Sequence, residues 1–208
     1  MTSYLLRPII PVLVSTSAAI LLTSVLAIIV RGDEIPLFLL QPVVLVLAAG
    51  AAYLLDDESK LMTDVVPASL LHRRTSRVLA GFAVLAVGGA VLAGMLQWWA
   101  PSAPLPALAW ETAGLAFLAV AASAVTARHG ESEPGNLVTS AGALIFIGVL
   151  ILQPMLHVTW LVRSPEDSAH GGWWAAVMLA AALTFLLSSR EWSPLRARGP
   201  RRSGMVLR

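Results

Sequence analysis

The sequence contains no cysteine and very little charge, and both shortages exclude whole classes of protein. Without cysteine the chain forms no disulfide, no cysteine-based zinc site and no thiol redox centre. Asp, Glu, Lys and Arg make up 12% of the 208 residues, against roughly 25% in an ordinary soluble domain. Hydrophobic residues make up 57%, and the mean hydropathy is +0.78. This composition indicates a protein whose natural solvent is the lipid bilayer.

The common nucleotide-binding and catalytic motifs are also missing. The single lysine, Lys60, follows no glycine-rich loop, so a Walker phosphate site is excluded. The sequence has no HExxH or GxSxG motif, which argues against an enzyme. Its four histidines are scattered along the chain, which argues against a metal site. The basic residues flank apolar runs instead of forming a patch for nucleic acid, so we expect no cofactor, metal or nucleic acid on this chain.

Six long apolar runs follow one another, and each approaches the ~20 residues with which a helix crosses ~30 Å of hydrocarbon. The runs are continuous rather than alternating, and irregular backbone cannot face lipid, so they predict transmembrane helices. The expected fold is an all-α integral membrane protein with six transmembrane helices in one domain, residues 1–190. The predicted spans are about 9–30, 36–55, 78–98, 105–127, 137–162 and 173–188.

The basic residues predict how these spans are oriented. With a cytoplasmic N-terminus, 12 of the 14 Lys and Arg residues fall on the cytoplasmic side, and only Arg31 and Arg163 fall outside. Positive residues concentrate on the cytoplasmic side of membrane proteins, so we expect both termini inside. The basic tail, residues 191–208, is then cytoplasmic and either disordered or bound to anionic lipid. The expected location is the inner (plasma) membrane, as a multi-pass protein.

Tryptophans gather near the predicted outer ends of the spans, where amphipathic rings meet lipid headgroups. We interpret them as membrane anchors rather than as part of a cofactor site. They are Trp98, Trp99, Trp110, Trp160, Trp173 and Trp174, with Trp192 as the counterpart on the inner face.

Three polar side chains within the predicted spans are candidates for a transport pathway: Gln41, Glu111 and Gln153. Glu111 is the only acid near a span interior, and a carboxylate in a membrane is costly enough to suggest a function. The alternative is that it reaches the outer interface beside Trp110. Gln41 and Gln153 each stand between a leucine and a proline. This repeat indicates either paired helix kinks that line a pathway or two ordinary membrane prolines.

Small residues recur every four positions in the third predicted span, at Ala86, Ala90 and Gly94. Such a stripe lets two helices approach closely. The partner helix is expected either within the same chain or in a second copy of it.

The densest charge cluster lies between the second and third spans, in residues 56–77. Apolar residues recur there at three- and four-residue steps, and acids stand near the start, where the helix dipole favours them. The pattern predicts a short amphipathic cytoplasmic helix over about 57–70. Helices that rest on lipid usually carry Lys and Arg on their polar face, so the acidic start favours a protein partner. The predicted contact residues are Asp57, Glu58, Leu61, Met62, Val65, Val66, Pro67 and Leu70.

This segment and the topology resemble type 2 ABC transporter permeases, which have six spans, cytoplasmic termini and a coupling helix between spans two and three. The order of residues is similar to the family's pattern: Asp57-Glu58, an amphipathic stretch, Pro67-Ala68-Ser69, and then Arg73-Arg74 before the third span. The chain departs from the pattern at Ser59-Lys60-Leu61, where glycine and threonine usually follow the acid, and it lacks a large external domain.

The resemblance implies a permease subunit of an ATP-driven exporter. The coupling helix would then bind a separate ATP-binding subunit, which would hold ATP and Mg²⁺, so no cofactor is expected on this chain. Two permease copies, identical or homologous, would form the pathway within membrane lipid. Two other functions stay open from the residues: a non-transporting membrane scaffold or assembly protein, and a secondary transporter that uses Glu111.

Overall fold

The computed structural model describes residues 2–29, 37–56, 70–129, 133–156 and 169–189. Within these ranges the chain forms six α-helices and one short 3-10 helix. They are α1 (Thr2–Ile29), α2 (Leu37–Ala52), η1 (Tyr53–Leu55), α4 (Leu70–Trp99), α5 (Leu105–Arg128), α6 (Pro134–Leu156) and α7 (Ala169–Ser189). The predicted all-helical fold is thus confirmed for the described part of the chain.

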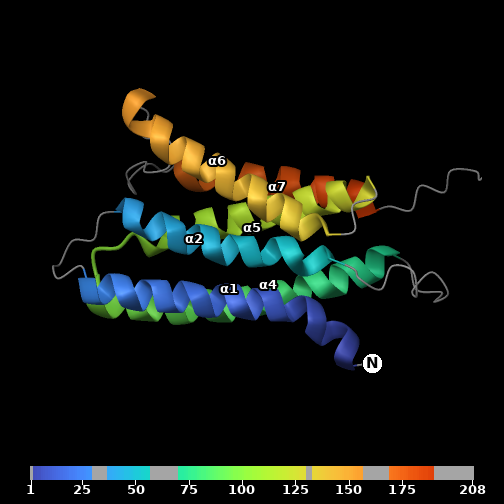
Figure 1. Cartoon of the computed structure of the whole chain (residues 1–208), viewed down its shortest axis with the longest axis horizontal. Helices are drawn as coiled ribbons and strands as arrows, with labels where there is room; N and C mark the ends of the chain where they lie inside the picture. The colour runs from blue at the N-terminus through green and yellow to red at the C-terminus, as the bar shows by residue number, and fades with distance from the viewer. Residues whose placement is uncertain (1, 30–36, 57–69, 130–132, 157–168, 190–208) are drawn as a thin grey trace, which may run out of the picture.

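Successive helices run in opposite directions along one common axis, which gives an up-and-down bundle (Figure 1). Helix α1 packs mainly on α2 and α4, whereas α5 packs mainly on α2 and α7. Helix α6 makes fewer contacts, with α5 and α2, and its second half leans away from the bundle in Figure 1. Helices α2 and α5 therefore form the centre of the bundle.

Four of the described helices are long and apolar enough to cross a membrane. Large apolar side chains on their outer faces are exposed, such as Val87, Ile28 and Leu179 at 64–71%. Exposed apolar faces of this extent are unusual for a protein in water and suit a lipid surround. The four membrane-length segments are Ile9–Ile29, Arg74–Trp99, Leu105–Arg128 and Gly171–Ser189, and the described apolar segments Leu39–Leu55 and Pro134–Val149 are shorter.

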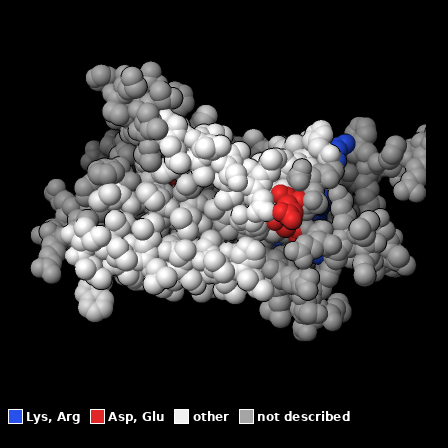
Figure 2. All heavy atoms as spheres, viewed as in Figure 1, with Lys and Arg blue, Asp and Glu red and all other residues white. Residues whose placement is uncertain are grey.

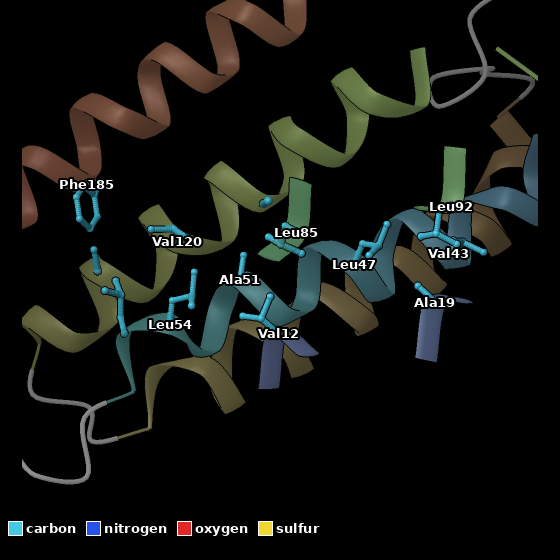
Figure 3. Packing of buried hydrophobic residues seen from close by; sticks show 13 residues of the cluster. Val12, Ala19, Val43, Leu47, Ala51, Leu54, Leu85, Leu92, Val120 and Phe185 are labelled. Carbon is cyan, nitrogen blue, oxygen red and sulfur yellow. The ribbon is translucent and has the colours of Figure 1, made fainter. Parts of the chain in front are cut away.

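The buried core lies where α1, α2, α4 and α5 meet, and Phe185 of α7 extends it (Figure 3). Val12, Leu47 and Leu54 lie among its central residues, each at most 4% exposed. Glycine makes the helix contacts around this core close. A side chain at Gly50 would meet Ser15 of α1, and one at Gly88 would meet Thr16 of the same helix. The absent side chains let the backbones of α2 and α4 approach α1.

Each observed α-helix overlaps a predicted span, but α1 begins at Thr2 and not near residue 9. The largest difference within the described residues is in α4, which begins at Leu70 and not near residue 78. The basic stretch expected at the level of the inner headgroups is therefore already helical at Arg74 and Arg77. In the fifth predicted span, residues 157–162 lie outside the described residues.

Candidate functional site

The two ends of the bundle differ in chemistry. At one end, hereafter the charged end, η1, α5 and α7 finish and α4 and α6 begin. Figure 2 shows that most of the charged side chains visible among the described residues of this face lie there. Described charged residues at this end are Asp56, Arg74, Arg77, Arg128 and Glu133.

The opposite end, hereafter the tryptophan end, holds the last turn of α4 and the first turns of α5 and α7. Trp98, Trp110 and Trp173 are 90%, 42% and 67% exposed there, which suits their predicted role as anchors. Trp174 differs, because it is only 9% exposed and its ring lies against Gly114 of α5. For Trp174 the interpretation as an interfacial anchor is wrong, since its ring is part of the bundle interior.

Two of the three predicted pathway residues line one cavity. Gln41 of α2 and Glu111 of α5 both border a space of about 740 Å³ between α2, α5 and α6, which Trp174 of α7 closes on one side. We call this space the Gln41–Glu111 cavity. Gln153, the third candidate, falls in α6, but its side chain lies outside the described residues. Spaces of about 300–1,000 Å³ are typical of small-molecule sites.

Gln41 is buried in the second turn of α2 and is 5% exposed. Neither its side-chain oxygen nor its side-chain nitrogen has a hydrogen-bond partner among the described residues. The next residue, Pro42, lies inside the helix and has no N–H to donate, so the helix loses one backbone hydrogen bond at this level. A buried amide without a partner is uncommon in proteins and calls for an explanation.

Glu111 lies about 9 Å along α5 from its first residue, Leu105, since a helix rises ~1.5 Å per residue. It is 8% exposed, whereas its neighbour Trp110 is on the outside of the bundle. The carboxylate therefore lies in the cavity and not on the exposed surface beside Trp110. Acidic side chains within membrane helices commonly face such interior spaces and mark sites of ligand or ion contact.

The remainder of the cavity wall is almost entirely apolar. Leu45, Leu115, Leu118 and Phe146 are among the residues along its length. Polar atoms return toward the charged end, where the Thr139 hydroxyl of α6 is buried without a hydrogen-bond partner among the described residues. The cavity is thus apolar along most of its length and has polar side chains near each end. Only the polar side chains at the tryptophan end include a carboxylate.

A second cavity, of about 420 Å³, lies on the other side of α2, between α2, α4 and α5. The small residues Ala86, Gly89 and Ala90 border it. Side chains at Gly89 or Gly94 would meet nothing within 4 Å in the described chain. The predicted small-residue stripe therefore does not hold α4 against another described helix of this chain at Gly94.

Hydrogen bonds join neighbouring helices at the charged end. The Asp56 carboxylate, directly after η1, accepts a hydrogen bond from the backbone N–H of Gly135 in α6, with 2.6 Å between Oδ1 and N. The Ser123 hydroxyl of α5 donates to the carbonyl of Ala52 at 2.8 Å. These bonds tie the end of α2 to α5 and α6.

Asp56 is also held close to the start of α6 by shape. A side chain on Gly135 would come within 2.7 Å of Asp56 Oδ2 and 2.9 Å of the Tyr53 backbone, so only glycine fits this approach. On the far side of α5, the Arg128 guanidinium donates to the Leu187 carbonyl of α7 at 3.3 Å. Four helices are thus linked at this end.

The predicted contact residues of the amphipathic segment, Asp57 to Pro67, lie outside the described residues, and Leu70 is the first residue of α4. Among the described residues, no group of three His, Asp or Glu side chains could hold a metal ion. Compared with known proteins, the chain matches no family model, no curated protein and no solved structure.

Sequence reasoning singled out Gln41 and Glu111 because polar residues stand out in apolar runs. The sequence did not indicate that Trp174 and Thr139 border this cavity. It also did not indicate that Asp56 bonds to Gly135. Only weak signals were present: Trp174 lies one residue after another tryptophan, and Gly135 lies at the start of an apolar run. Neither pattern indicates which helix each residue contacts.

Proposed function

We propose that this protein is the membrane-spanning permease subunit of an ATP-driven ABC exporter. It crosses the inner membrane six times, acts as a dimer with a second identical or homologous permease, and couples to a separate subunit that binds ATP and Mg²⁺. The observation that carries the proposal is the network of bonds at the charged end. The network joins Asp56, where residues 57–69 begin, to α6, and it joins the end of α2 to α5. Residues 57–69 are the segment that resembles a coupling helix.

Lengths support six spans. The continuous helical segment of α2 and η1 extends about 30 Å, and the 23 residues of α6 extend about 35 Å, from the rises of α- and 3-10 helices. Both lengths match a hydrocarbon core of ~30 Å. In the antiparallel order, α1 begins and α7 ends on the side of the charged end. Arg74, Arg77 and Arg128 lie at that end, which supports a cytoplasmic placement.

The charged end also supports a route for mechanical coupling. A displacement of the segment 57–69 acts directly on η1 at Asp56 and on α4 at Leu70, where the segment is attached. From Asp56 it reaches α6 through the bond to Gly135. From Ala52 it reaches α5 through the bond from Ser123. Because α2, α5 and α6 are also the walls of the Gln41–Glu111 cavity, such a displacement would change the cavity's shape.

The outward stripe on α4 supports a dimer. Ala90 and Gly94 are exposed, and no described helix of the same chain covers Gly94. A stripe of small residues allows a second copy to approach closely in the membrane. One six-helix bundle of this kind would supply half of a pathway, and the second copy the other half.

The decisive experiment is capture of the tagged protein from its native membrane in mild detergent, followed by mass spectrometry. We expect a soluble ATPase with a Walker motif to co-purify. The double substitution Asp57→Lys with Glu58→Lys should abolish that capture, because it reverses the charge of the proposed contact. The matched control is Glu166→Lys with Asp167→Lys, an equal charge change in the connection between the last two helices, which should retain the ATPase.

Two results would overturn the proposal. One is the absence of any ATPase under conditions that keep a control ABC complex intact. The other is undiminished capture by the variant with lysine at positions 57 and 58. Recovery of a partner that is not an ATPase would favour the scaffold function.

One observation favours a second candidate, a secondary transporter, namely the position of Glu111 inside a cavity between helices. In that case transport in proteoliposomes would follow an imposed proton gradient without ATP. Glu111→Gln would abolish it. An ATP requirement with no response to the gradient would exclude this alternative.

A further inference from the structure

The Gln41–Glu111 cavity has the chemistry of a ligand site. We propose that it binds a single-chain amphiphile with a cationic amino-alcohol head. The head lies at the tryptophan end, between Gln41 and Glu111, and the apolar tail lies along α5 toward Thr126. Binding itself depends only on the cavity, whereas naming this ligand as the transported substrate rests on the proposed exporter function.

The first argument is the hydrogen-bonding capacity of Gln41. Its amide offers one acceptor and two donor positions, and within the described chain both side-chain atoms are buried without a partner. Buried polar groups in proteins are nearly always satisfied. An ammonium group donates to the Gln41 oxygen, and a neighbouring hydroxyl accepts from the Gln41 nitrogen. A purely apolar ligand would leave both atoms unsatisfied.

The second argument is the charge and ring at the same end. The Glu111 carboxylate borders the cavity at 8% exposure, in surroundings of low dielectric where attraction to a cation is strong. Trp174 also borders the cavity, and an indole face attracts ammonium groups. A carboxylate beside an aromatic ring favours a cationic head and repels phosphate or sulfate heads.

The third argument is the length and composition of the remaining wall. From Glu111 to Thr126 the cavity follows fifteen residues of α5, or about 22 Å at ~1.5 Å per residue. The side chains between them are apolar, among them Leu115, Leu118 and Ala122. An unbranched alkyl chain suits a space this long and this apolar. The volume of about 740 Å³ accommodates one such chain with its head.

The cavity also has an entrance from the membrane. Leu118 of α5 and Ile145 of α6 line it and are nevertheless 43% and 68% exposed, so the opening runs between the outer faces of these two helices. Because these faces are apolar, the opening faces lipid and not water. An amphiphile dissolved in the bilayer can therefore enter sideways, tail first.

The test uses the purified full-length protein in lipid nanodiscs without any ATPase. The probe is a tetradecylamine with a hydroxyl beside the amine-bearing carbon and a photoreactive diazirine in mid-tail. We expect saturable labelling in α5 and α6, mapped by mass spectrometry to the cavity wall. The unlabelled amino alcohol should displace the probe, and tetradecyl sulfate at the same concentration should not.

Four variants locate the site. Glu111→Gln should weaken probe binding at least about tenfold, because a buried charge pair is lost. Gln41→Leu should also weaken it, by about tenfold or less. Gly142 lines this cavity and Gly89 lines the second cavity, and a side chain at either meets nothing within 4 Å. Gly142→Leu should therefore block labelling, whereas Gly89→Leu should leave it unchanged.

Circular dichroism and gel filtration confirm that each variant is folded. The proposal is wrong if the label spreads evenly over the outer helix faces. It is also wrong if the sulfate displaces the probe as well as the amino alcohol does, or if Gly142→Leu labels like the wild type. Because no ATPase is present, such a failure leaves the exporter function standing with another substrate. Conversely, if the probe labels the cavity specifically but no ATPase co-purifies with the protein, the ligand site is supported and the exporter function is rejected.

Discussion

The charged end and the tryptophan end of this bundle are built from the same helices but held together in different ways. At the charged end, polar bonds such as those from Gly135 to Asp56 and from Ser123 to Ala52 join neighbouring helices. At the tryptophan end, ring packing such as Trp174 on Gly114 joins α5 and α7, while α6 leans away. One end is therefore joined by directional hydrogen bonds, and the other by the close packing of a ring against a helix backbone.

Under the proposed exporter function, force would enter at the charged end and would change the shape of the cavity. At the charged end, hydrogen bonds link α2, α5, α6 and α7, so under the proposed function these helices would move together. At the other end, the Gln41 amide has no hydrogen-bond partner among the described residues and borders the cavity. Four measurements test this contrast between the two ends.

The largest expected effect concerns the sidedness of the two ends. In this cysteine-free chain, a single Glu133→Cys at the charged end should react only with a reagent supplied from the cytoplasm. Ser102→Cys, in the exposed turn at the tryptophan end, should react only from outside. The reverse pattern in oriented vesicles would invert the topology and remove the case for a cytoplasmic coupling segment.

The next effect concerns packing at the tryptophan end. Gly114→Val should destabilise the protein by about 3 kcal/mol, because the new side chain collides with the Trp174 ring and overpacks the contact. Gly148→Val in α6 meets open space and is the matched control for changing glycine to valine in a helix. Unfolding in a denaturing detergent series measures both. Equal losses of stability in the two variants would mean that the packing of Trp174 on Gly114 does not stabilise this end.

A third effect concerns the polar link at the charged end. Asp56→Ala should cost about 2 kcal/mol, because the partly buried N–H of Gly135 loses its charged acceptor. The control is Glu133→Ala, which removes an exposed carboxylate directly before α6. Among the described residues this carboxylate accepts a hydrogen bond from Asn136, three positions along the chain, so its loss should change stability by less than about 0.5 kcal/mol. If the two variants lose the same amount of stability, the link from Asp56 to α6 makes no measurable contribution to stability.

The smallest effect concerns the second polar link. Ser123→Ala should cost about 0.6 kcal/mol, the usual size of a hydrogen bond between membrane helices. Thr184→Ala removes a hydroxyl that bonds within α7 and is exposed, so no loss is expected. The same unfolding series, with replicate precision below this difference, separates the variants. A larger loss for Thr184→Ala would contradict the assignment of the link to Ser123.

Much of the helical layout could be predicted from the sequence. The bounds of α5 at Leu105 and Arg128 differ from the predicted span of 105–127 by one residue. Prediction succeeds here because the bilayer demands a fixed length of apolar helix, which is a local property of the chain. The early start of α4 was missed because its first two turns are basic rather than apolar, and helix length beyond the membrane is not set by hydropathy.

The sequence also marked Gln41 and Glu111 as unusual, since a polar side chain in an apolar run is visible without any structure. That both border one cavity follows only from the packing of α2 against α5. Trp173 and Trp174 are adjacent, and the sequence predicts both as interfacial anchors. In the structure Trp173 is exposed and Trp174 is buried.

The sequence alone therefore indicates that the chain forms apolar helices and roughly where they begin and end. It also shows which polar side chains stand within these apolar helices. The tertiary structure decided which faces turn inward, that Asp56 meets Gly135, and that a cavity lies between α2, α5 and α6. The physical reason is that these helices are apolar on nearly all sides. Hydropathy therefore does not orient them, and only the close fit of side chains does.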